Sequence, residues 1–173
     1  QQSATNLATA KDDAKEAINQ NLSDIADDIT QITADIDALE QIAADNPTNT
    51  EIADKLADAK EQLAAAETAK DAAQQALDAI DDQTTLADVA TQEKAGETAL
   101  ADADTAQQTA DQDLATAQDE AAKDLVADQV AGKATVNETI KSIQDAITTI
   151  TDDIATLTDL AAKNPADTQI AND

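Results

Sequence analysis

The sequence predicts an all-α protein, and three observations lead to this class. Gly and Pro occur only twice each in 173 residues, so the chain has few places at which to turn. There is no Phe, Tyr or Trp, so a core must be built from Ile, Leu, Val and Ala, which suit close-packed helices. Apolar residues recur at alternating spacings of three and four, as in a heptad seam. We therefore expect an antiparallel three-helix bundle.

The first helix is predicted at about residues 3–45, because a long seam runs through it. The seam residues are Ile18, Leu22, Ile25, Ile29, Ile32, Ile36, Leu39 and Ala43. Asn46-Pro47-Thr48-Asn49 ends the helix, since Pro disfavours helix at the preceding residue and Asn favours turns. Either Asn49 or Thr50 then serves as the N-cap of the next helix.

The second helix is predicted at about residues 50–81 and the third at about residues 84–118. The second seam is broken once by Lys70 and consists of Ile52, Leu56, Ala59, Leu63, Ala66, Ala73, Leu77 and Ile80. Residues 81–85 form the turn, with Thr84 or Thr85 as the cap. The third seam is interrupted by Glu93, Gly96 and Gln107 and consists of Leu86, Val89, Leu100, Ala103, Ala110, Leu114, Ala117 and Ala121.

An internal repeat with an offset of 118 positions is the most informative feature of the sequence. Asn46-Pro47 recurs as Asn164-Pro165. The match runs without a gap from Lys15 on Lys133 to Ala53 on Ala171, and the apolar positions keep their phase. We therefore assign residues 1–118 to a first three-helix repeat. Residues 119–173 form the first half of a second, with a helix at about 119–163 and the start of the next helix at 167–173.

One long helix is expected to run from the first repeat into the second. No Pro or polar turn cluster separates the two, and Gly132 is the only helix breaker between them. A Gly costs roughly 1 kcal/mol in a helix and does not have to end it. A continuous helix from about Thr84 to Lys163 would span roughly 120 Å at ~1.5 Å per residue.

The composition argues against catalysis and against several ligands. Cys, His, Met and Arg are absent, so the usual zinc, haem and copper ligands, the Cys–His and Ser–His–Asp groups and bidentate phosphate clamps are all missing. A net charge of −27 disfavours nucleic acids and anionic membrane surfaces. No apolar run is long enough for a membrane span, and no signal peptide is visible. We expect a non-enzyme with no cofactor and no metal. A start at Gln1 without any Met predicts an internal fragment or a processed product.

Asp-rich clusters are candidate calcium sites, because Ca²⁺ takes several oxygen ligands. The clusters are Asp27-Asp28 with Asp35, Asp81-Asp82, Asp102 with Asp104, Asp111 with Asp113, and Asp152-Asp153. None has the order of an EF-hand loop, and neighbouring carboxylates on a helix point in different directions. Solvated acidic helix faces are the favoured interpretation.

Candidate glycosylation sites are also present. Two tripeptides match the N-glycosylation pattern, Asn21-Leu22-Ser23 and Asn137-Glu138-Thr139. They do not align at the repeat offset and Leu22 lies in the seam, so coincidence is favoured. A threonine-rich edge could accept O-glycans, although a polar helix edge is the simpler interpretation; it consists of Thr148, Thr149, Thr151, Thr156 and Thr158.

An apolar stripe in the second repeat lacks the helices that would cover it. It consists of Ile140, Ile143, Ile147, Ile150, Ile154 and Leu157. An exposed seam of this length drives association. We expect these residues to form a homo-dimer or another chain-to-chain contact, or to pack against the first bundle.

The layout resembles spectrin-type repeats, in which the third of three antiparallel helices continues into the next unit. It is also similar to the helical-bundle repeats of giant matrix-binding surface proteins of Gram-positive bacteria, in repeat size and in Ala/Asp/Thr/Lys composition. The resemblance implies a structural spacer, the stalk of an extracellular adhesin on a bacterial cell surface, with neighbouring repeats of the same protein as its partners. The alternatives are a surface module that binds a host or matrix protein, and a self-assembling filament subunit.

Overall fold

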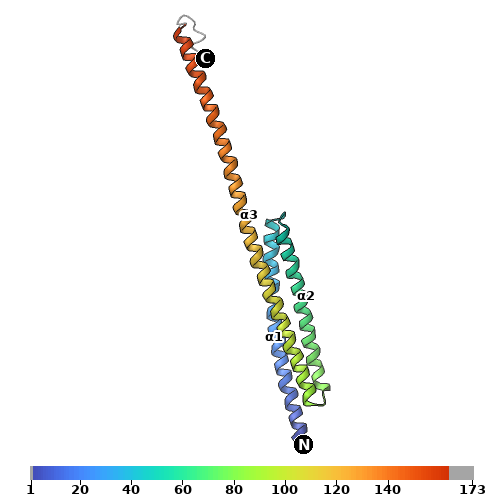
Figure 1. Ribbon diagram of the computed structural model, residues 1–173. Helices are drawn as coiled ribbons and strands as arrows, with labels where there is room; N and C mark the ends of the chain where they lie inside the picture. The colour runs from blue at the N-terminus through green and yellow to red at the C-terminus, as the bar shows by residue number, and fades with distance from the viewer. Residues whose placement is uncertain (1, 164–173) are drawn as a thin grey trace. The chain divides into compact units, whose positions relative to one another are not determined.

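The computed structural model describes residues 2–163, with side chains from residue 4 onward. It contains α1 (Gln2–Asp45), α2 (Thr50–Ala79), the short 3-10 helix η1 (Ile80–Asp82) and α3 (Leu86–Lys163) (Figure 1). The prediction of an all-α protein is confirmed for these residues, which contain no strand. The short helix expected at residues 167–173 lies outside the described part of the chain.

The chain divides into two compact units, residues 1–123 and residues 124–173. Unit 1 contains α1, α2, η1 and the first part of α3, which ends at Lys123. Unit 2 contains the second part of α3, residues 124–163, among the described residues. Helix α3 passes through Gly132 without interruption, and it starts two residues later than the expected Thr84.

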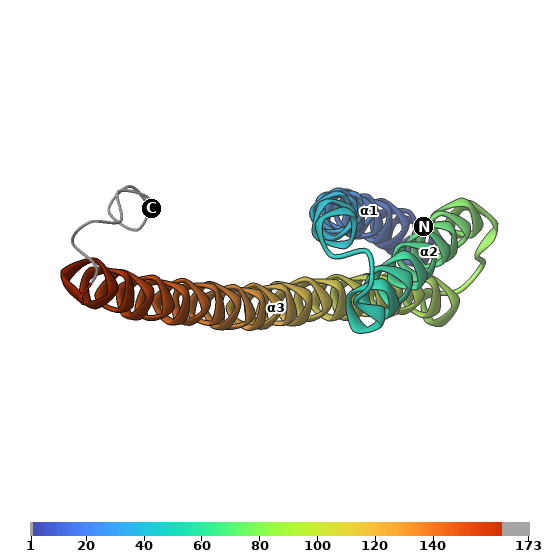
Figure 2. The ribbon, with the colours of Figure 1, turned by 90° about the horizontal axis from the view of Figure 1, so that it is seen from above.

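Unit 1 forms because three apolar seams face one another. Its main core contains Ile25, Ile32, Ile36 and Leu39 of α1 together with alanines from α2 and the first part of α3. A smaller core near the η1 end contains Ile18, Ile80 and Val89. Figures 1 and 2 show the three helical segments side by side. A core with so many alanines requires the helix backbones to approach closely.

The two turns follow the expected chemistry and decide between the alternatives for the caps. The N-cap of α2 is Asn49, whose side-chain oxygen accepts hydrogen bonds from the backbone N–H groups of Glu51 at 3.0 Å and Ile52 at 3.1 Å. At the start of α3, Thr85 accepts from the backbone N–H of Asp88 at 3.2 Å and donates to its carboxylate at 2.7 Å. Each cap satisfies N–H groups that have no partner within the helix.

The predicted seam of the third helix needs correction. Leu86 is 52 % exposed, so it does not belong to the core. Gly96, expected to interrupt the seam, is buried in it. A Cβ placed on Gly96 would lie 2.9 Å from Cγ1 of Ile18. The small residues Ala99 and Ala106 are also buried, although the heptad assignment omitted them. Small residues of α3 therefore belong to the core, although the pattern of large apolar residues does not indicate them.

Candidate interaction surface

The apolar stripe of unit 2 is the most conspicuous surface of the described chain. We call Ile140, Ile143, Ile147, Ile150, Ile154 and Leu157 the exposed stripe. Its five isoleucines are between 47 % and 58 % exposed, while Leu157 is partly buried. Their spacing alternates between three and four residues, so all six lie on one face of the helix.

Residues at the same positions of α1 have the opposite environment. At the offset of 118 positions Ile25, Ile32 and Leu39 correspond to Ile143, Ile150 and Leu157. The three α1 side chains are fully buried at 0 % exposure, whereas Ile143 and Ile150 are 55 % and 57 % exposed. The same pattern therefore builds a core in unit 1 and an open apolar surface in unit 2.

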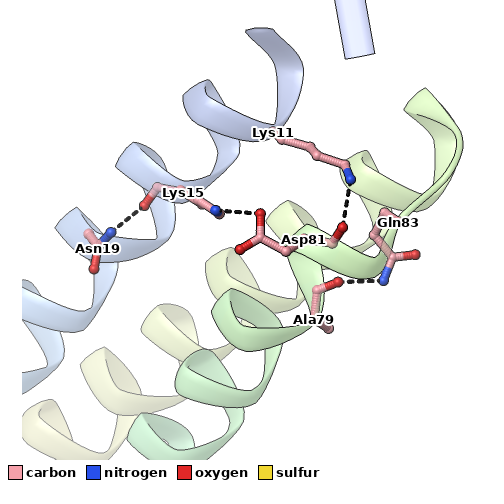
Figure 3. A network of polar contacts seen from close by, with 6 residues as sticks. All are labelled: Lys11, Lys15, Asn19, Ala79, Asp81 and Gln83. Atoms are coloured by element: carbon pink, nitrogen blue, oxygen red, sulfur yellow. Dashed lines mark hydrogen bonds and ion pairs between the residues drawn. The ribbon is translucent and has the colours of Figure 1, made fainter. Parts of the chain in front are cut away.

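A polar network joins the N-terminal part of α1 to the turn after α2, and we call it the turn network. Lys15 Nζ lies 2.5 Å from Asp81 Oδ1, and Lys11 Nζ donates to the Asp81 backbone carbonyl at 2.7 Å (Figure 3). Asn19 donates to the backbone carbonyl of Lys15 at 2.8 Å. The hydrogen bond from Lys15 lowers the pKa of the Asp81 carboxyl below its ordinary value.

A second ion pair joins α2 to the first part of α3. Lys55 Nζ contacts Asp113 Oδ1 at 3.0 Å and Asp58 Oδ2 at 3.3 Å. The hydrogen bond with Asp113 raises the pKa of Lys55. Asp113 is only 5 % exposed, so its carboxylate is largely removed from water and its charge is balanced by the ion pair with Lys55. The expectation of a solvated acidic face is wrong for Asp113.

The expectation of a solvated face is also wrong for Asp35, which is 3 % exposed. Its Oδ1 accepts a hydrogen bond from Gln31 at 3.0 Å, while its Oδ2 has no hydrogen-bond partner among the described residues. Burial raises the pKa of the Asp35 carboxyl, and the neighbouring Asp111 of α3 raises it further. A second carboxyl group close by disfavours ionisation, so the proximity of Asp111 favours the protonated form of Asp35.

Asp28 repeats this arrangement seven residues earlier in α1. Burial raises the pKa of Asp28, and Asp104 of α3 adds to this effect. The structure thus joins members of separate Asp clusters, Asp28 with Asp104 and Asp35 with Asp111. No group of three or more His, Cys, Asp or Glu side chains suited to a metal ion occurs among the described residues. Each of these contacts brings together two carboxyl groups, one from α1 and one from α3.

The remaining candidate positions lie on helix surfaces. An open groove of about 450 Å³ between α2 and α3 is lined mainly by alanine and threonine, with Asp102 as its one titratable lining residue. Asn137 is exposed, whereas Asn21 and Leu22 are partly buried in unit 1. The threonine-rich edge at 148–158 uses its hydroxyls locally, because each of its five threonines donates to the backbone carbonyl four residues earlier.

No helix within the described residues has both the length and the apolar character needed to cross a membrane. Comparisons with known proteins give no relative: no family model, no curated protein and no solved structure matches the chain. Its function must therefore be argued from its own residues.

Proposed function

We propose that the chain is a non-catalytic spacer built from tandem three-helix repeats, the stalk of an extended surface protein or adhesin outside a bacterial cell. The observation that carries this proposal is the exposed stripe. It reproduces the seam of α1 at an offset of 118 positions, yet the described residues of unit 2 provide no cover for it. In a protein with further repeats, the two helices that follow would cover the stripe as α2 and the first part of α3 cover α1.

The course of α3 supports the same proposal. One helix carries residues of both units, and no turn residues separate Lys123 from Lys133. Neighbouring repeats that share a helix form a chain in which each repeat contacts only its neighbours. The net charge of −27 keeps such a chain soluble and discourages contact between copies.

A series of chains with one, two and three added 118-residue units tests the spacer function. Small-angle scattering should give a maximum dimension that increases by a constant increment with each unit, at all protein concentrations. A maximum dimension that stays nearly constant as units are added would contradict a spacer, because the repeats would then fold back on one another.

A self-assembling filament subunit is the second candidate, and the exposed stripe also favours it. Apolar patches of this kind on a single chain mark contact sites. Sedimentation of the 173-residue chain over a dilution series separates the two candidates. A filament subunit forms species larger than a dimer as the concentration rises, whereas a spacer lacking its next repeat does not.

A further inference from the structure

The partner of the exposed stripe can be described in more detail, on the basis of the proposed spacer function. We infer that the stripe binds an antiparallel helical hairpin with the chemistry of residues 50–121, and that Lys133 sets its register by pairing with an acidic residue in the turn of that hairpin.

The exposed stripe and the seam of α1 are equivalent apolar surfaces. Each stripe residue matches an α1 residue of the seam that packs on α2 and the first part of α3: Leu22, Ile25, Ile29, Ile32, Ile36 and Leu39. Five of the six pairs are identical, and Leu22 is replaced by Ile140. A hairpin that fits the first surface therefore has the right spacing for the second.

The turn network of unit 1 has equivalent residues in the second copy. In unit 1 the cation of Lys15 pairs with Asp81, and Asn19 binds the backbone carbonyl of Lys15 (Figure 3). Both α1 residues are identical in the second copy, as Lys133 and Asn137, whereas Lys11 corresponds to Gln129. The lysine that pairs with the turn side chain is thus kept, which indicates an acidic partner in the turn of the occupant.

The second surface is also less acidic than the first. Residues 15–45 contain eight carboxylates and one lysine, whereas residues 133–163 contain five carboxylates and three lysines. Residues 50–121 carry eighteen carboxylates against four lysines, so an acidic hairpin of this kind is repelled less by residues 133–163 than by residues 15–45, against which it already packs in unit 1.

The test uses the whole chain, extended after Asp173 by a copy of residues 56–121, which continues the repeat at the offset of 118 positions. Hydrogen exchange is measured at the backbone amides of residues 140–157. In the extended chain these amides should exchange at least about tenfold more slowly than in the 173-residue chain, because packing raises the free energy of local opening.

Charge reversal tests the register. Lys133→Glu in the extended chain should speed exchange near residues 133–143 by about threefold to tenfold, since it turns an exposed attraction into a repulsion. Lys141→Glu is the matched control and should have no such effect, because Lys141 corresponds to the exposed Ser23 on the outer face of α1. Asp81→Lys in the appended copy, combined with Lys133→Glu, should restore slow exchange.

The possible outcomes separate this inference from the spacer proposal. Slow exchange with equal effects of Lys133→Glu and Lys141→Glu overturns the role of Lys133 and leaves the spacer intact. No slowing in the extended chain overturns both. Slow exchange that already occurs in the 173-residue chain and increases with its concentration identifies a second copy as the occupant, and overturns the hairpin.

Discussion

Residues 15–45 and residues 133–163 have nearly the same apolar spacing and opposite environments. The first segment is covered by α2 and the first part of α3, and its seam isoleucines Ile18, Ile25 and Ile32 are fully buried. The second is helical as well, although its isoleucines are about half exposed. Both segments are therefore helical although only one seam is packed, and the seam of α1 is buried because α2 and the first part of α3 cover it. Matched substitutions in the two segments measure how much each contributes to stability.

The largest contrast is expected at Ile32 and its equivalent, Ile150. Ile32→Ala should lower the free energy of unfolding of unit 1 by about 2–5 kcal/mol, because it opens a cavity in the core. Ile150→Ala removes a side chain that is 57 % exposed and should change stability by less than about 0.5 kcal/mol. Urea unfolding followed by circular dichroism at 222 nm measures both variants. Equal losses would mean that the stripe is packed in solution.

Substitution of the two glycines of α3 by alanine should change stability in opposite directions. Gly96→Ala places a Cβ 2.9 Å from Cγ1 of the buried Ile18, so overpacking of about 1–3 kcal/mol opposes a helix-propensity gain of about 1 kcal/mol. Gly132→Ala meets no atom within 4 Å and should simply gain about 1 kcal/mol of helix stability. Thermal unfolding of both variants checks this difference. Stabilisation by Gly96→Ala would mean that α1 can move away from α3 without a loss of packing stability.

The smallest contrast concerns Asp35 and its equivalent Asp153. The folded state raises the pKa of Asp35 above its ordinary value of 3.8, so its contribution to stability is present at low pH and is lost as pH rises through the folded pKa. Asp35→Asn should therefore raise the stability of unit 1 at pH 7 by about 1 kcal/mol, since the amide can donate to Asp111.

Asp153→Asn is the control, because Asp153 is exposed and its substitution should change stability by less than about 0.5 kcal/mol. Melting temperatures between pH 7 and pH 4.5 should rise on acidification for the wild type, and rise less for Asp35→Asn. A wild type that becomes less stable over this interval would show that Asp35 is not held in the acidic pair with Asp111.

The parts of the fold set by local chemistry could be predicted from the sequence. The Asn-Pro turn after α1, the polar turn before α3 and the large residues of the α1 seam all follow from rules that act within a few residues. The burial of Gly96 and Ala99 could not be predicted in this way. Their place in the core depends on how closely α1 approaches α3, and hydrophobic periodicity carries no signal for that distance.

The buried carboxylates were missed for a related reason. A heptad pattern places charged residues on the outer face, but Asp35 and Asp113 are short side chains beside the seam whose neighbours Asp111 and Lys55 are distant in sequence. The exposed stripe, in contrast, could be found from the sequence by its match to α1.

The segments that cover α1 are synthesised after it, and this order matters during synthesis on the ribosome. Residues 1–45 are made before the segments that cover them, and their seam stays open until residues 50–121 have followed, roughly 4–15 s later at ~5–20 residues per second. During that interval the apolar seam of nascent α1 is uncovered, as the exposed stripe of unit 2 is. Ten carboxylates against two lysines in residues 1–45 then keep growing chains apart. The ionised carboxylates of Asp28 and Asp35 lower the stability of the finished bundle at neutral pH. The same two carboxylates add to the negative charge that keeps nascent α1 segments from associating before α2 and α3 are made.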